Sequence, residues 1–441
     1  MAFAIKLLEK SQELAKCVEL EDPKYREQKQ KLIALLAPPI SAVMIGAGER
    51  AITIGGEEVM YRHELTYYRP TAIAITVDDM MPREELLKRV KAVEGFQIVR
   101  VGQNLKLDMI AVRCTSSDPT KFSNTVSEVL KHSKLPLILC SYDPKILEAG
   151  LSAAKAHRPL IYAATKDSWK QMGELALKYN CPVVISAPND LTLLRSLANS
   201  LTGMGLSDIV LDPGTFPDAG LDETINNFTM IRRAAIENRD KLLGFPIIGI
   251  PATAWLKPEV SSELTKMKEA YIASALLVRY ASILIMETLD SWALLPVLTL
   301  RQNIYTDPRK PVAVEPGLRE IGKPNENAPV LLTSNFAITY YTVANDIESA
   351  NIDCYLLVAD TEGLSVQTSV AGKKLTGDKV AELINKTGIE GKVKHKKLIV
   401  PGHASRLKGD IEESTGWTVL VGPIDSSGIP KFLEERWKKS D

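Results

Sequence analysis

The stretch Ala72-Ile73-Ala74-Ile75-Thr76-Val77 is apolar at five of its six positions and shows no alternation between apolar and polar residues. Continuous apolarity of this kind is what a strand buried on both faces requires, as parallel strands covered by helices are. Seven further runs of the same kind follow along the chain: Asp108–Val112, Leu135–Cys140, Leu160–Ala164, Pro182–Ser186, Asp208–Leu211, Pro246–Ile250 and Ala281–Met286. The repetition predicts a parallel sheet.

Longer segments with a helical period separate these runs, among them Arg83–Val93, Asp167–Tyr179, Leu191–Leu201 and Ser261–Val278. Eight strands that alternate with helices predict an α/β chain with a (β/α)8 TIM barrel, and the near-regular spacing favours closure over an open doubly wound sheet. The motif Gly46-Ala47-Gly48-Glu49-Arg50-Ala51 matches a dinucleotide fingerprint. Strand-like residues follow it where the fingerprint needs a helix, so a hairpin turn explains it better.

A stretch rich in proline and glycine, between Tyr305 and Pro324, predicts a linker after the barrel. Four apolar runs and three helical segments beyond it predict a small Rossmann- or flavodoxin-like α/β domain. The predicted organisation is a helical lead-in over residues 1–40, the barrel over 41–310 and the second domain over 311–441.

Composition excludes several classes of protein. The 441 residues carry 54 Lys and Arg against 54 Asp and Glu, and this zero net charge argues against a nucleic-acid partner. No apolar run approaches the roughly 20 residues that span a bilayer, so we expect no membrane partner. The N-terminus does not match a signal peptide, and the five cysteines are scattered and odd in number. These features predict a cytoplasmic protein with reduced thiols.

Polar residues follow several of the predicted barrel strands, at the end where barrel enzymes place their chemistry: Asp143, Lys166, Asn189, Asp190, Asp212 and Glu287. Polar residues are expected at any solvated strand end, so these positions alone do not identify an enzyme. The sequence holds no zinc-protease, P-loop or nucleophile-elbow motif, and its five histidines do not cluster.

The predicted strand ends of the second domain are more informative. Turns with glycines and hydroxyls follow them, at Thr333–Phe336, Asp360–Ser365, Gly402–Ser405 and, most densely, Gly422–Gly428. In open α/β sheets ligands bind outside the carboxyl ends of the strands. Glycines let the backbone approach a ring closely, and hydroxyls donate hydrogen bonds without charge. The pattern favours a bulky uncharged ligand with amides at its periphery over a nucleotide.

The sequence resembles a known family in stretches that lie along almost the whole chain. The chain resembles the large (gamma) subunit of the corrinoid iron–sulfur protein of the acetyl-CoA decarbonylase/synthase complex. Matching stretches include Ala37–Ile40, Tyr61–His63, Val210–Gly214, Arg301–Pro308, Thr333–Phe336, Asp360–Val366 and Gly416–Pro423. Long matches in the same order are far more specific than a single short motif.

The resemblance implies a methyltransferase component that acts as a methyl carrier. Cobalt(I) of a bound cobamide would accept a methyl group from a methyl-tetrahydropterin, either a sarcinapterin or a folate. The carrier would pass it to the nickel cluster of acetyl-CoA synthase in the Wood–Ljungdahl (acetyl-CoA) pathway. The implied partners are a small (delta) subunit as heterodimer, the acetyl-CoA synthase subunit and a pterin-dependent methyltransferase. Chemistry would occur on cobalt, so no catalytic side chain is expected.

The resemblance also implies where the cobamide binds. The residues expected to contact the macrocycle and its amides are Thr333, Asn335, Thr361, Gly363, Leu364, Ser365, Gly402 and Gly422. Those expected to hold its side chains or nucleotide tail are Ser426, Ser427 and Gly428. The sequence lacks the D-x-H-x-x-G motif that supplies a histidine ligand to cobalt, and the family uses none. We therefore expect a base-off cobamide without a protein ligand, although His403 follows a predicted strand.

The N-terminus departs from the family, whose [4Fe–4S] cysteines run C-x2-C-x4-C-x16-C. Sixteen residues precede Cys17, which places Cys17 at the fourth ligand position. A cluster held by protein thiolates needs four of them. We therefore expect residues 1–40 to include a remnant of the iron–sulfur domain, with the other three ligands absent and no cluster in this chain.

Two other functions stay open on the sequence. One is a pterin-binding TIM-barrel methyltransferase, with Asn189, Asp190 and Asp212 at the barrel mouth gripping the pterin. The other is a scaffold in which both domains serve only to hold a multienzyme complex together.

Overall fold

The computed structural model describes residues 3, 7, 14–308 and 311–437. The chain forms two compact units. The first comprises residues 1–98 and 105–305, and the second comprises residues 99–104 and 306–441. The boundary between them falls at Tyr305, near the start of the predicted linker. None of the described helices is both long and apolar enough to cross a bilayer.

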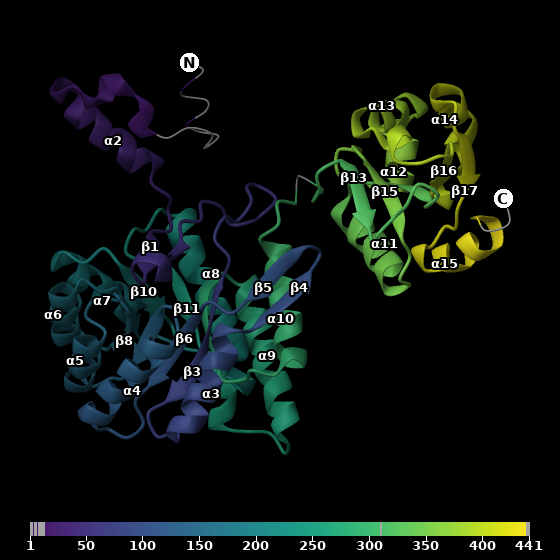
Figure 1. The fold of residues 1–441 in the computed structure, drawn as a ribbon. Helices are drawn as coiled ribbons and strands as arrows, with labels where there is room; N and C mark the ends of the chain where they lie inside the picture. The colour runs from purple at the N-terminus through teal and green to yellow at the C-terminus, as the bar shows by residue number, and fades with distance from the viewer. Residues whose placement is uncertain (1–2, 4–6, 8–13, 309–310, 438–441) are drawn as a thin grey trace. The chain divides into compact units, whose positions relative to one another are not determined.

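The first unit is a closed barrel of eight parallel strands, which confirms the predicted α/β class and barrel (Figure 1). In order around the barrel the strands are β3 (Ala72–Asp78), β6 (Met109–Arg113), β7 (Leu137–Cys140), β8 (Leu160–Ala164), β9 (Val183–Ser186), β10 (Ile209–Asp212), β11 (Ile247–Gly249) and β12 (Ala281–Met286). Strand β12 closes the barrel by pairing with β3, in a register that joins Ile283 to Ala72.

Eight helices surround the strands: α3 (Arg83–Glu94), α4 (Pro119–His132), α5 (Pro144–Ala153), α6 (Trp169–Tyr179), α7 (Leu191–Gly203), α8 (Leu221–Ile236), α9 (Ser262–Val278) and α10 (Ser291–Ile304). Residues that cap the N-terminus stabilise the first turn of several of these helices. At α4 the Asp118 carboxylate accepts hydrogen bonds from the backbone N–H groups of Thr120 and Lys121, and Pro119 occupies the first turn.

Successive residues of the barrel strands point to different cores. Ile73 and Ile75 of β3 pack in the cluster between strands and helices, whereas Ala74 belongs to the cluster inside the barrel. The hairpin of β1 (Ala42–Ile45) and β2 (Ile52–Gly55) adds Val43, Ile45 and Ile54 to this inner cluster. The barrel interior is therefore a packed core that the hairpin completes.

A second hairpin, β4 (Gln97–Arg100) and β5 (Gln103–Lys106), was not predicted. Its turn residues Val101 and Gly102 have φ of 48° and 69°, the two positive values of a type I′ turn. Its strands are short and mostly polar, so they carry no apolar run by which sequence alone could find them. The N-terminal residues described form short 3-10 turns and α2 (Arg26–Leu36).

The second unit holds a five-stranded sheet in the order β13 (Gly317–Ile321), β15 (Cys354–Ala359), β14 (Val330–Ser334), β16 (Lys397–Val400) and β17 (Thr418–Val421). The last four strands are parallel, and β13 runs antiparallel to β15 at the edge. The helices are α11 (Ala337–Ser349), α12 (Val366–Ala371), α13 (Gly377–Thr387), α14 (Lys408–Thr415) and α15 (Ile429–Phe432). Strand β13 lies within the predicted linker; Gly317 at its start and Gly322 just after it made this stretch resemble a loop.

Both faces of this sheet are covered. Leu332 of β14 packs in one cluster with residues of α12, α13 and α14, whereas Leu331 packs in the other with residues of α11 and α15. The sheet is therefore doubly wound. The chain leaves β14 toward β15 on one side and returns to β16 on the other, so the strand order reverses beside β14.

Arg301 of α10 ties the last barrel helix to the start of the first barrel strand. Its guanidinium donates to the backbone oxygens of Thr71 (3.0 Å) and Lys106 (2.6 Å) and to the Asp108 carboxylate, which also accepts from the N–H of Ile73 at 2.9 Å. Replacing this buried side chain leaves several acceptors unmet beside the β3–β12 seam.

We predict that Arg301→Met lowers the free energy of unfolding of the barrel by about 3 kcal/mol. Denaturant unfolding followed by circular dichroism measures the change. Arg195→Met is the matched control, because Arg195 is exposed and its ion pair with Asp240 stabilises by at most about 1 kcal/mol. Equal losses in the two variants would contradict the role given to Arg301.

Candidate functional site

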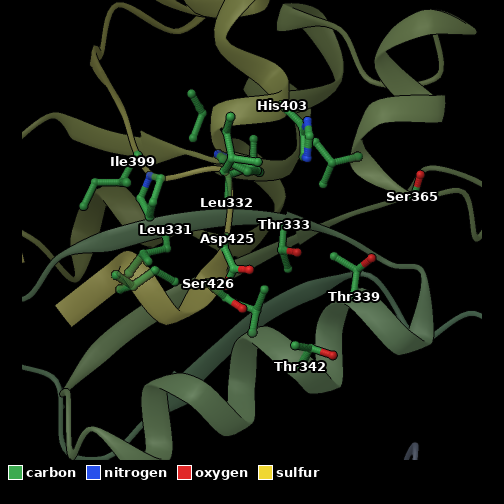
Figure 2. A pocket seen from close by; sticks show the side chains of 18 of the residues that line it. Leu331, Leu332, Thr333, Thr339, Thr342, Ser365, Ile399, His403, Asp425 and Ser426 are labelled. Carbon is green, nitrogen blue, oxygen red and sulfur yellow. The ribbon is translucent and has the colours of Figure 1, made fainter. Parts of the chain in front are cut away.

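A cavity of about 400 Å³ opens at the carboxyl edge of the second unit's sheet (Figure 2). Its lining comes from the ends of β14 and β16, the turn after β17, the first turns of α11 and the start of α12. This is the point beside β14 at which the strand order reverses. In doubly wound sheets the crevice at such a switch point is where ligands bind.

The cavity wall is mainly apolar. Leu331 and Ile399 come from neighbouring strands, and Val343 comes from α11. At the rim, Ile338 is 53% exposed and Ile424 is 71% exposed. Large apolar side chains left in water beside a cavity indicate a surface that an apolar ligand would cover.

Hydroxyl groups supply most of the polar lining. Figure 2 shows Thr333 near the centre of the view, Thr339 and Thr342 on the helix below it, and Ser365 to one side. Thr333 is only 1% exposed, and its Oγ1 has no hydrogen-bond partner among the described residues. A buried hydroxyl left without a partner costs free energy, which a ligand acceptor would recover.

The loop between β15 and α12 is held by one side chain of the neighbouring strand end. Asn335 follows β14, and its Oδ1 accepts hydrogen bonds from Thr361 N (2.9 Å), Thr361 Oγ1 (2.8 Å) and Gly363 N (3.0 Å). Both Asn335 and Thr361 are buried. Gly363 has φ of +74°, and a Cβ there would lie 2.8 Å from Pro311. This network fixes the backbone that leads to Ser365, whose hydroxyl caps α12.

The residues predicted to contact a cobamide fall into three groups. Thr333, Ser365, Gly422 and Ser426 line the cavity. Asn335, Thr361, Gly363 and Leu364 build the adjoining loop, whereas Gly402, Ser427 and Gly428 stand next to lining residues in the chain without lining the cavity themselves. A cobamide in contact with all eleven stays a prediction.

Gly402 has a definite packing role. Its N–H donates to the Pro423 oxygen at 2.9 Å, and an added Cβ would lie 2.9 Å from the Ile424 nitrogen. The absence of a side chain therefore lets the turns after β16 and β17 meet backbone to backbone.

Sequence reasoning missed Thr339 and Thr342, which also line the cavity, and it included Asp425 only as part of the turn Gly422–Gly428. Thr339 and Thr342 lie three residues apart on α11, and this spacing puts both on one face of a helix. Threonines on an amphipathic helix are common, so this signal was too weak to single them out.

His403 lines the cavity and is exposed. Of the five histidines, it is the one that the sequence analysis considered able to reach the cobalt of a bound cobamide. The described residues contain no group of three or more His, Cys, Asp or Glu side chains that could hold a metal ion by themselves.

Cys17, the predicted fourth cluster ligand, precedes a short 3-10 turn, and its thiol donates to Glu19 Oε2 at 3.3 Å. Among the residues that the structure describes, Cys17 belongs to no group of three or more His, Cys, Asp or Glu side chains that could hold a metal ion. Its assignment as a cluster ligand stays a prediction.

The barrel residues assigned to the pterin alternative are already engaged. Asp190 caps α7 by accepting from Leu193 N at 2.8 Å, and Asn189 exchanges hydrogen bonds with Glu223 and Asn227. Asp143 likewise caps α5. Asp143 and Asp190 therefore cap helices, and Asn189 links the end of β9 to helix α8.

Asp212, at the end of β10, is 1% exposed. Its carboxylate accepts from Tyr162 Oη (2.7 Å), Ser186 Oγ (2.8 Å) and Gly214 N (2.9 Å). Burial raises the pKa of Asp212 above its usual value, and the three hydrogen bonds only partly oppose this rise. The three donors therefore stabilise the ionised carboxylate less than its burial destabilises it.

We predict that Asp212 makes the barrel less stable as pH rises from about 4. Because its pKa is higher in the folded state, the folded chain binds the proton more tightly, and ionisation removes that advantage. Asp212→Asn should flatten this part of the stability–pH curve, since the hydroxyls of Tyr162 and Ser186 can turn to accept from an amide. Asp212→Ala leaves the donors unmet and should cost about 1–3 kcal/mol.

Urea unfolding of the three proteins across pH 4–7 measures these effects. A curve for Asp212→Asn that is as steep as that of the parent would contradict the prediction. The exposed residue Asp222 offers a matched control as Asp222→Asn, which should leave the slope unchanged.

Comparison with known proteins places the chain in a family. The family model described as CO dehydrogenase/acetyl-CoA synthase delta subunit matches residues 42–433. The acetyl-CoA decarbonylase/synthase complex subunit gamma of Methanothermobacter thermautotrophicus is 46% identical over 435 residues, covering 99% of this chain and 94% of that protein. The subunit gamma of Archaeoglobus fulgidus is 46% identical over 444 residues, covering 99% and 94%.

Solved structures resemble the barrel more distantly. A dihydropteroate synthase from Xanthomonas albilineans, in complex with 7,8-dihydropteroate, aligns over 60% of this chain and all of its own, with 14% identity and a TM-score of 0.43.

The family match corrects the resemblance inferred from sequence. That resemblance assigned the chain to the large subunit of a corrinoid iron–sulfur protein with most of its iron–sulfur domain missing. The matching model is instead that of the delta subunit, and the names of the relatives mention neither corrinoid nor cluster. The name gamma subunit is shared by relatives that are 46% identical over 99% of this chain, so it is the corrinoid iron–sulfur identity that the comparison overturns. The chain belongs to the CO dehydrogenase/acetyl-CoA synthase delta subunit family, with gamma subunits of acetyl-CoA decarbonylase/synthase complexes among its close relatives.

Proposed function

We propose that this chain is a cytoplasmic subunit of an acetyl-CoA decarbonylase/synthase complex that holds a cobamide in the cavity of its second unit and carries methyl groups. The observation that carries the proposal is the cavity itself. It lies at the switch point of a doubly wound sheet, is walled by apolar side chains and contains the unpartnered Thr333 hydroxyl.

The lining residues fit a large uncharged ring with amide side chains. Among the residues that the structure describes, neither lysine nor arginine lines the cavity, and Asp425 is the one carboxylate. Hydroxyls of Thr339 and Thr342 can donate to amide oxygens, and the exposed rim residue Ile424 can pack against an apolar ring face. A phosphate-rich nucleotide would instead call for cationic side chains or a glycine-rich helix start.

When bound, the cobamide would supply cobalt(I) as the nucleophile that accepts a methyl group from a methyl-tetrahydropterin and yields it to the nickel cluster of acetyl-CoA synthase. The chain's own contribution is to bind and orient. Thr333 and the α11 threonines would fix the amides, while Leu331 and Ile399 keep water from the part of the ligand that enters the cavity.

The partners in this proposal follow from the same chemistry. A cobamide held at the rim by Ile338 and Ile424 would extend beyond the cavity, and a second subunit of the complex would cover the rest of it. A pterin-dependent methyltransferase would deliver the methyl group, and the acetyl-CoA synthase subunit would receive it. Membership of the relatives in a named multi-subunit complex supports this arrangement.

Anaerobic incubation of the full chain with hydroxocobalamin, followed by gel filtration and a visible absorption spectrum, tests the proposal. We expect corrin absorbance to elute with the protein. Thr342→Trp should abolish this co-elution, because Thr342 is exposed on α11 and a tryptophan there would fill the cavity. Asn345→Trp is the control, since Asn345 is exposed on the same helix but does not line the cavity.

The proposal fails if the parent protein elutes without corrin absorbance, or if Thr342→Trp retains as much corrinoid as Asn345→Trp. A second variant tests the polar contact. Thr333→Val removes the unpartnered hydroxyl without changing the side chain's shape, so it should weaken cobalamin binding while leaving the free protein at least as stable.

A further inference from the structure

Helix α9 of the barrel unit is apolar on its outer face as well as on its inner face. Its inner face buries Ile272, Leu276 and Leu277 in the cluster between strands and helices. Figure 1 shows α9 on the outside of the barrel, and there its side chains Met267 and Tyr271 are 63% and 65% exposed. A surface helix ordinarily keeps polar side chains outside, whereas a helix that is apolar all round is buried. The exposed face of α9 therefore has the composition of a face that another helix covers.

The exposed apolar side chains follow a regular spacing. Four of them repeat along α9 at intervals of three, four and seven residues: Leu264, Met267, Tyr271 and Val278. Ser274 stands between the last two and completes an alternation of three and four. This alternation places all five on one line along the helix, the α9 seam, which is the geometry by which helices pack in coiled coils. The seam is about 21 Å long.

A groove of about 550 Å³ runs beside the α9 seam. The first three seam residues line it, together with Leu221 at the start of α8. In the segment before α9, Leu256 and Val260 extend the apolar surface, since both side chains are almost fully exposed. The groove is separate from a cavity of about 580 Å³ at the carboxyl ends of β3, β6 and β12. Contiguous exposed apolar side chains beside a groove mark a surface for another protein.

Carboxylates outnumber cations around the groove. The charged side chains in and beside it are Asp218, Asp222, Glu259 and Glu263 against Lys257 and Lys268. Lys268 is already bound to Asp218 at 2.5 Å and to Glu259 at 2.9 Å. Lys266, the other lysine of α9, lines the separate barrel cavity and pairs there with Asp290 at 3.0 Å. The rim of the groove is therefore acidic and complements a basic partner.

We propose that the α9 seam and its groove dock an amphipathic helix of a partner protein, whose apolar stripe is flanked by lysine or arginine. The stripe packs on the seam, and the flanking cations meet the acidic rim. A second copy of this chain is not the occupant, because a symmetric contact would set one acidic rim against another. The inference concerns the barrel unit and does not depend on a cobamide in the second unit.

Fluorescence anisotropy of the full chain with two labelled, stapled helical peptides of three heptads tests the proposal. Both peptides carry leucine at positions a and d, and they carry either lysine or glutamate at e and g. At nanomolar concentration neither peptide pairs with itself. We expect the lysine peptide to bind about tenfold more tightly at low salt, and added salt to reduce the difference. Equal affinities, or tighter binding of the glutamate peptide, would overturn the proposal.

Variants locate the binding. Leu264→Glu and Tyr271→Glu should each weaken the lysine peptide about tenfold or more, because each places a charge on the apolar seam. Leu177→Glu is the matched control, since Leu177 lies on α6 and, like Leu264, is 46% exposed. The double variant Asp222→Asn with Glu263→Gln should narrow the preference for lysine over glutamate. Affinities in both seam variants equal to that of Leu177→Glu would refute the site.

Sedimentation velocity of the parent protein and of Leu264→Glu decides between a partner and a second copy. We expect the two proteins to sediment alike. A parent dimer that Leu264→Glu dissociates would overturn the proposal, because the seam would then be the contact between two copies of this chain.

Discussion

The candidate site in the second unit depends on the Asn335 side chain, although that side chain does not line the cavity. One amide oxygen accepts two backbone N–H groups and one hydroxyl from the loop after the neighbouring strand. Those N–H groups are buried. Without Asn335 they would need other acceptors, and if they found none the loop would lose its ordered conformation. The position of Ser365, and with it the start of α12, follows from this single constraint.

The barrel strands could be predicted because burial on both faces leaves a simple trace in the sequence. The run Leu160–Ala164 coincides with β8, and Ala281–Met286 coincides with β12. Strands without this burial left no such trace. The hairpin β4–β5 and the edge strand β13 are short and partly polar, and they are held by backbone pairing that the identity of their side chains does not reveal.

The site could be predicted only as a region. Sequence places Thr333 at the end of a buried strand, and the structure puts it in the cavity wall. Sequence cannot tell that Asn335 and Thr361 satisfy one another, since hydroxyls and amides that bind a ligand look the same as those that bind a loop. Nor could it find Thr339 and Thr342, because their shared cavity exists only once α11 packs beside β14.

The two cavities differ in how they would recognise a ligand, and the difference is one of charge. In the second unit an apolar wall and scattered hydroxyls select for size and shape, since a hydroxyl accepts almost any polar neighbour. The barrel cavity is instead lined by two arginines and one lysine against three carboxylates, and most of these charges are paired with one another. The two cavities therefore differ in the charge of the side chains that line them.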